Sequence, residues 1–136
     1  MVLENASLKE IQEFFSHDNF ASKACGAQII SAQRGHAICE LTLDSVHRNA
    51  MGGVMGGAIF TLADFALAIA CNVGEPPTVL VSANIDYLSA ARGKRLIAEC
   101  KAEKSGRSLG FYTIEIHDEE GVLVARMSAT CARKPA

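Results

Sequence analysis

The stretch HRNAMGGVMGGAIFTLADFALAIACN, residues 47–72, decides the fold. Its second part, residues 56–72, is apolar on every side except at Asp64. A helix that is hydrophobic all round is buried rather than laid on a surface. At 1.5 Å per residue such a helix is roughly 25 Å long, which is enough to cross a small domain. The sequence therefore predicts one long central helix over residues 56–72.

Two features of this stretch point to chemistry. A carboxylate in the middle of a buried helix is costly to desolvate unless it has partners, and Asp64 has none within the helix. Four glycines leave backbone N–H groups uncovered where the helix dipole is positive: Gly52, Gly53, Gly56 and Gly57. The alternatives are a buried acid satisfied by another element and glycines that only allow close packing.

The segments on either side of the helix predict strands. Residues 25–31 and 37–43 flank the hairpin signal Gln33-Arg34-Gly35, and Pro76-Pro77 ends the helix. Four later runs are β-branched or alternating and are separated by tight-turn compositions: 78–88, 95–104, 109–117 and 122–132. These four runs predict an antiparallel meander. A short amphipathic helix over residues 7–15, with a Ser7/Glu10 capping box, and a loop over 17–23 precede the first strand.

One long helix with about six antiparallel strands is an α+β arrangement. The simplest way to bury the helix is to wrap the sheet around it, which leaves one flank open for a second subunit. We expect a single domain over residues 1–136, with the N-terminal helix and loop in 1–24 and the core in 25–135.

Composition excludes several function classes. A net charge of −2 does not favour a nucleic-acid binder. Five cysteines lack zinc-site spacing, so no metal is expected, and their odd number suits a reducing cytoplasm. The polar N-terminus shows no signal peptide. Residues 54–74 are long and apolar enough to span a membrane, but Asp64 would lie near the bilayer centre, which argues against a membrane protein.

The motifs carry a resemblance to a known family. The string His47-Arg48-Asn49-x-x-Gly52-x-x-Met55-Gly56-Gly57, followed by Leu62-Ala63-Asp64, resembles the hotdog-fold acyl-CoA thioesterases of the phenylacetate-pathway (PaaI-like) group. That family's pattern is N-x-x-G-x-x-H-G-G followed by a helix with an Asp. The one departure is Met55, which stands where the family has His. Residues 84–90 (NIDYLSA) resemble the family's third strand.

The resemblance implies roles for individual residues. Asp64 is then the general base or nucleophile, while Asn49 and the Gly56 N–H polarise the thioester carbonyl. Met55 and Gly57 lie beside the substrate. A family Ser or Thr on the next strand corresponds here to either Leu80 or Ser82, so Ser82 is a candidate that helps to position water.

Other residues imply binding of coenzyme A, which is part of the substrate; no separate cofactor is expected. Loop cations are natural partners for its phosphates, and Arg92, Lys104 and Arg107 lie in loops between strands. Gly106 falls in a segment that resembles the family's glycine turn. Ordinary solvated turn charges are the alternative for each cation. The four histidines are expected at the surface, His47 included.

Geometry adds an expectation about assembly. Thioester hydrolysis needs a base on one side of the carbonyl and donors on its oxygen. Asp64 follows Gly56 by eight residues, which is about 12 Å along the axis, so one helix cannot supply both groups to one carbonyl. We therefore expect at least a homodimer with a shared site, and the resemblance implies a homotetramer. Because Met55 cannot donate the hydrogen bond of a His, a non-hydrolytic acyl-CoA binder is the alternative function.

Overall fold

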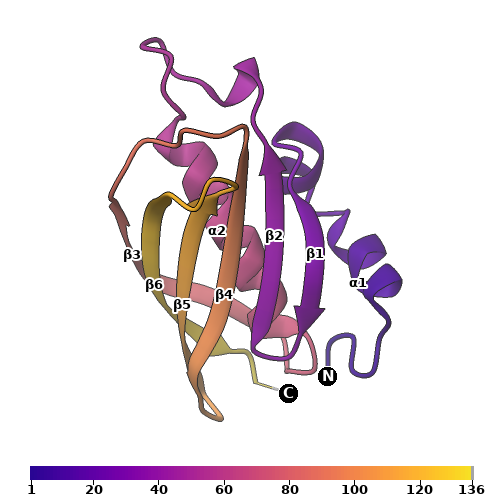
Figure 1. Cartoon of the computed structure of the whole chain (residues 1–136). Coiled ribbons are helices and arrows are strands. Elements are labelled where there is room, and N and C mark those ends of the chain that lie inside the picture. The colour runs from indigo at the N-terminus through magenta and orange to yellow at the C-terminus, as the bar shows by residue number, and fades with distance from the viewer. Residues whose placement is uncertain (136) are drawn as a thin grey trace.

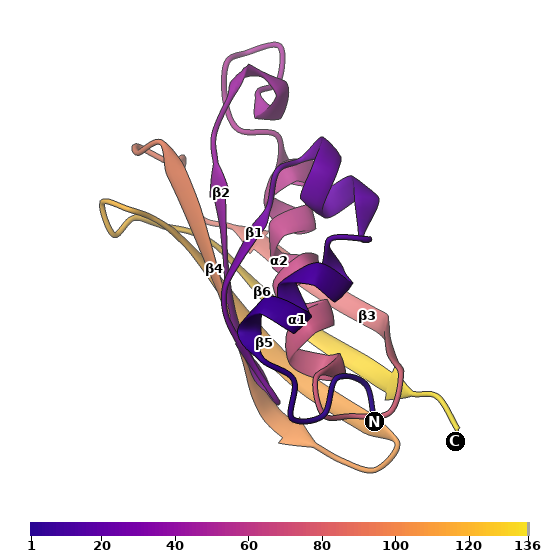
Figure 2. The ribbon, with the colours of Figure 1, turned by 90° about the vertical axis from the view of Figure 1, so that its right-hand side faces the viewer.

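A computed structural model describes residues 1–135, so Ala136, the last residue of the predicted domain 1–136, lies outside the described residues. The predicted central helix is confirmed as α2, Gly56–Asn72. It lies against one face of a six-stranded sheet (Figures 1 and 2), and the apolar core forms between the two. Gly74, with φ +71°, and the following prolines end the helix. Within the described part of the chain, no helix has the length and apolar character to cross a membrane.

The sheet is antiparallel throughout, with the strand order β1-β2-β4-β5-β6-β3. Its strands are β1 Gln28–Gln33, β2 His36–Thr42, β3 Thr78–Tyr87, β4 Arg95–Ser105, β5 Leu109–Asp118 and β6 Leu123–Arg133. The predicted meander is correct for β4, β5 and β6. It is wrong for β3, which pairs with β6 at the far edge of the sheet rather than with β4.

The position of β3 follows from the connection to β4, which crosses the ends of the strands between them (Figure 1). The buried Asp118 side chain holds this connection. Its Oδ2 atom accepts hydrogen bonds from the N–H groups of Arg92 and Gly93 at 2.8 and 3.0 Å. Its Oδ1 atom accepts from Glu120 and Val122 in the β5–β6 turn at 3.0 and 2.9 Å. One carboxylate therefore joins the crossover to the turn, a contact that no local pattern could predict.

The N-terminal segment covers one side of α2. Helix α1, Leu8–Phe15, begins with the predicted capping box, and its Phe15 ring packs edge-on against Phe65 of α2 at a centroid distance of 6.4 Å. The predicted loop over 17–23 is in part helical, because a π-helix, η1, spans Phe20–Ala24. Strand β1 consequently starts at Gln28, three residues later than predicted.

A buried arginine ties the far end of α2 to the sheet. Arg133 of β6 is 9% exposed and forms an ion pair with Glu75 at 3.1 Å. Its guanidinium also donates hydrogen bonds to four oxygens: the Cys71 carbonyl, Thr78 Oγ1, Ser105 Oγ and Tyr112 Oη. Because the Cys71 carbonyl belongs to the last turn of α2, the positive charge also lies at the negative end of the helix dipole.

Candidate functional site

One stripe of α2 is not covered by the sheet. Gly57 is exposed, and Phe60, Thr61, Asp64 and Ala68 are partly exposed, at the three- and four-residue spacing of one helix face. The remaining positions of the helix are mostly buried in the core. The open flank expected from the sequence is therefore present, and Asp64 lies on it.

Asp64 lines a cavity of about 470 Å³ between α2 and the segment that leads to η1. Asp18, Asn19 and Phe20 form the wall opposite the helix. Burial raises the pKa of the Asp64 carboxyl, and the negative charge of Asp18 raises this pKa further. Within residues 1–135 the Asp64 side chain has no recorded ion pair or hydrogen bond. The carboxylate is therefore available to a ligand in this cavity.

The loop before α2 is held by Asn49. Its Oδ1 atom accepts hydrogen bonds from the N–H groups of Met51 and Gly53 at 3.0 and 3.1 Å. The backbone of Asn49 closes the same turn, since its N–H donates to the Gly53 carbonyl at 2.8 Å. The two interpretations of Asn49 are therefore compatible. Its oxygen serves the turn, while its amide nitrogen is left as a hydrogen-bond donor.

The start of α2 presents free backbone donors. Met55 is the N-cap residue without a side-chain cap, and its N–H donates to the His47 carbonyl at 2.8 Å. Within the described residues no hydrogen bond is recorded from the N–H groups of Gly56 and Gly57. The first N–H groups of a helix have no intrahelical acceptor and lie at the positive end of its dipole. These two amides can therefore receive an oxyanion.

The two glycines open to different sides of the helix start. Gly56 lines a groove of about 750 Å³ together with Arg48 and residues 88–91. Gly57 lines a mainly apolar cavity of about 620 Å³ together with Met55, whose side chain lies against Gly57. Phe20, Phe60 and Thr61 line both this apolar cavity and the cavity of Asp64, so the two adjoin along the open flank of α2.

His47 is not at the surface, contrary to the expectation from its polar neighbours. It is 5% exposed; its Nε2 donates to the Cys25 carbonyl at 2.6 Å, and its Nδ1 accepts from the Asp44 N–H at 3.0 Å. These bonds tie the 3₁₀ turn Ser45–His47 (η2) to the segment before β1. The histidine is structural, and the acceptor that buries it lies 22 residues earlier in the chain.

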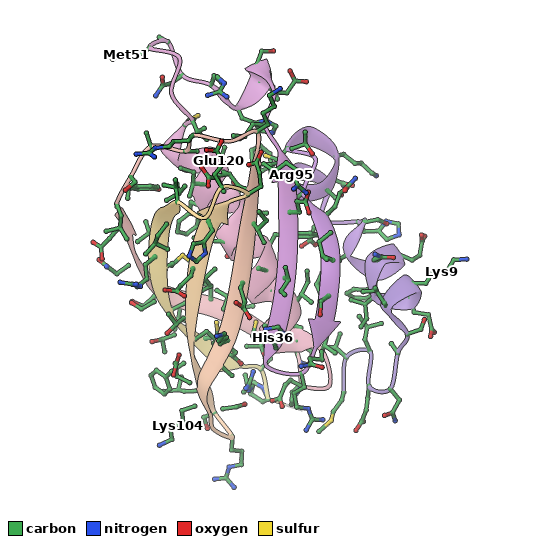
Figure 3. All side chains as sticks on the ribbon, in the orientation of Figure 1. Lys9, His36, Met51, Arg95, Lys104 and Glu120 are labelled. Atoms are coloured by element: carbon green, nitrogen blue, oxygen red, sulfur yellow. The ribbon has the colours of Figure 1, made fainter. Side chains whose placement is uncertain are left out.

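The remaining predicted residues are spread over the molecule. Ser82 is exposed on β3, beside an irregularity in the pairing with β6. Arg92 lies in the crossover loop, at the same end as the start of α2 (Figure 1). Lys104 lies near the end of β4, and Gly106 and Arg107 belong to the β4–β5 turn that follows. Figure 3 shows Lys104 at the opposite end of the molecule from Met51. One chain therefore does not gather these cations around one ligand.

Comparison with known proteins gives a consistent picture. The profile of the thioesterase superfamily matches residues 51–125. The acyl-coenzyme A thioesterase PaaI of Escherichia coli is 34% identical over 105 residues, which cover 76% of this chain and 75% of that protein. Human acyl-coenzyme A thioesterase 13 is 31% identical over 125 residues, with coverage of 88% and 89%. The solved structure of E. coli PaaI superposes with a TM-score of 0.83 at 29% identity, covering 96% of this chain and 98% of that one.

Proposed function

The chain belongs to the thioesterase superfamily and has the hotdog fold of a thioester hydrolase, and from this premise we propose that it hydrolyses acyl-CoA thioesters to the free acid and coenzyme A. The observation that supports this function most is the Asp64 carboxylate, which lies without a structural partner in a cavity on the open flank of α2. A partly buried acid with a raised pKa and no structural partner is typical of a catalytic group.

The proposed chemistry assigns each group a task. Asp64 either takes a proton from the attacking water or attacks the thioester carbonyl itself. The Gly56 N–H and the free amide nitrogen of Asn49 stabilise the negative charge that develops on the carbonyl oxygen. In the water route the tetrahedral intermediate collapses, the carbon–sulfur bond breaks, and the proton held by Asp64 passes to the leaving thiolate of coenzyme A. In the direct route the carbon–sulfur bond breaks to leave a mixed anhydride on Asp64. A water then hydrolyses the anhydride to the free acid, which restores the carboxylate, and a proton of that water goes to the thiolate. Both routes require the ionised form of Asp64.

The proposed site is shared between two subunits. Within one chain Asp64 and Gly56 line different cavities, separated by about 12 Å along the helix. Edge strand β3 is exposed on both faces, and Val79 and Val81 are 43% and 56% exposed, so this edge is suited to pair with a second copy. A homodimer would bring Asp64 of one copy towards the helix start of the other, and a homotetramer would repeat this unit.

Mixed dimers test the shared site. We expect that Asp64→Asn and Asn49→Ala chains are each inactive alone, and that mixing them restores about a quarter of wild-type activity. Half of the randomly assembled dimers would be mixed, and each of these would hold one site with both native residues. Activity would be measured after mixing under dissociating conditions, with each variant mixed with itself as the control. Mixed samples as inactive as their parents would contradict the shared site.

The proposal extends to the class of substrate, and the lining of the cavities supports it. The space beside Gly57 is lined mainly by apolar side chains, among them Phe20, Val46, Met55 and Phe60. It suits a hydrophobic or aromatic acyl group. Arg92 and Arg48 lie at the same end and are candidates for the phosphates of coenzyme A. Lys104 and Arg107 could reach the same ligand only from another subunit.

Met55 favours a second candidate function, binding of acyl-CoA without hydrolysis, because its thioether folds over Gly57 and donates no hydrogen bond. A panel of acyl-CoAs with aromatic and aliphatic acyl groups separates the two functions. Release of free thiol that requires Asp64 would support the thioesterase. Tight binding of acyl-CoA without thiol release would support the binder.

A further inference from the structure

Tyr87, the last residue of β3, reaches across to the start of α2. Its Oη donates a hydrogen bond to the Gly56 carbonyl at 3.0 Å. The ring also packs directly on this glycine, because a Cβ atom added to Gly56 would lie 3.2 Å from the Tyr87 Cζ and Oη atoms. The tyrosine is 52% exposed and is therefore not held there by burial in the core.

This hydrogen bond acts on a functional peptide group. The Gly56 carbonyl and the Gly57 N–H belong to the same planar unit, so a donor that fixes the carbonyl also fixes the direction of the N–H. A hydrogen bond to the carbonyl also polarises the unit and makes its N–H a stronger donor. Within residues 1–135 no acceptor is recorded for the Gly57 N–H, and Gly57 lines the apolar cavity beside the cavity of Asp64.

The ring has a second effect. Tyr87 lines both the groove at Gly56 and the cavity at Gly57, so it forms part of the wall between them. A ligand that extends from the groove into the cavity along this wall would contact the aromatic ring at the helix start. The hydroxyl and the ring can be tested separately, since phenylalanine keeps the wall and removes only the O–H.

We propose that Tyr87 is a positioning residue, whose hydroxyl aligns the Gly56–Gly57 peptide so that the Gly57 N–H acts as a further donor to the developing oxyanion. This inference rests on the proposed thioesterase function. It adds to the oxyanion site a donor, Gly57, and the side chain that orients it. Because the donor is used most strongly when charge develops on the oxygen, its effect falls on the reaction rate rather than on substrate binding.

Tyr87→Phe tests the hydroxyl in the full chain. We expect kcat to fall about 3- to 10-fold, the effect of one neutral hydrogen bond, while KM changes less than about twofold. Ser128→Ala, which removes an exposed hydroxyl from the neighbouring strand β6, is the matched control and should leave both constants unchanged. A Tyr87→Phe enzyme with wild-type kcat would overturn the inference.

Two inhibitors separate positioning from a merely structural role. A trifluoromethyl ketone analogue of acyl-CoA adds water or a carboxylate to form a tetrahedral oxyanion mimic, whereas the plain methylene ketone analogue resembles the substrate. Tyr87→Phe should weaken the first by the same factor as kcat and leave the second unchanged. Equal weakening of both would overturn the assignment. The Asp64→Asn variant separates a failure of this inference from a failure of the proposed function. If hydrolysis survives Asp64→Asn, the proposed function itself is wrong, whatever the result for Tyr87.

Discussion

Replacing Asp64 with asparagine is expected to lower kcat for acyl-CoA hydrolysis by about 10²- to 10⁴-fold, since the amide can neither accept the proton of water nor attack the carbonyl. The side chain keeps its size, so the cavity beside Asp18 and Phe60 is preserved. The measurement is thiol release at saturating substrate. Glu13→Gln, the same change of charge on the exposed face of α1, is the control and should retain full activity.

The same substitution is expected to raise the melting temperature at neutral pH. Burial and the charge of Asp18 raise the pKa of Asp64 in the folded state above its unfolded value. The ionised carboxylate therefore destabilises the fold. The stability that goes with the protonated carboxyl is fully present below the unfolded pKa and is lost as the pH rises through the folded pKa. The gain in melting temperature should shrink in acid. A lower melting temperature at neutral pH would instead show that Asp64 is part of the architecture.

The raised pKa also affects the pH profile. Because hydrolysis needs ionised Asp64, the acid limb of kcat/KM should lie at a higher pH than for an ordinary aspartate. Asp18→Asn removes the neighbouring negative charge and should move this limb to lower pH. An acid limb that stays in place in this variant would exclude Asp18 as a determinant of the Asp64 pKa.

Replacing Arg133 with methionine is expected to lower the free energy of unfolding by about 3–5 kcal/mol, the range for breaking a buried ion pair. Methionine fills much of the space but leaves Glu75 without its buried partner and four oxygens without a donor. The melting temperature should fall by about 10 °C or more, as measured by calorimetry.

Arg126→Met is the matched control, because Arg126 forms an exposed ion pair with Glu115 at 3.1 Å. Exposed ion pairs contribute about 0–1 kcal/mol, so Arg126→Met should change the free energy of unfolding by no more than about 1 kcal/mol. Adding Glu75→Gln to Arg133→Met should recover part of the loss, since it removes a charge whose other ion pair is a 3.5 Å contact with the half-exposed Arg34. If the two arginine variants were equally stable, the Arg133 network would not hold the end of α2 to the sheet.

Local signals predicted the elements that depend on local physics. The run before Asn72, which is apolar except at Asp64, predicted α2 because its hydrophobicity alone requires burial. The Ser7/Glu10 capping box predicted the start of α1 because both of its residues lie within one helical turn. Asp64 was a candidate because a charge stands out in such a run. Its free carboxylate agrees with that interpretation, while its role as base is still a prediction.

The errors concern contacts between distant segments. Turn compositions could not show that β3 joins the far edge, because the crossover loop that this arrangement requires is bonded to Asp118, which lies at least 25 residues later in the chain. His47 looked solvated because its buried acceptor, the Cys25 carbonyl, lies in another element. Tyr87 was part of a strand pattern, and nothing in that pattern indicated that its hydroxyl reaches Gly56. Each missed contact joins residues that are far apart in sequence.

The pairing of β3 with β6 also bears on how the chain is made. Of the six strands, β6 is made last, so a growing polypeptide carries β3 without its neighbour until β6 has been synthesised. An unpaired strand with exposed apolar side chains can form hydrogen bonds with strands of other chains and so start aggregation. Premature termination before Leu123 should therefore yield fragments that aggregate. Chaperones that bind at the ribosomal exit tunnel would protect this chain chiefly between the synthesis of β3 and that of β6.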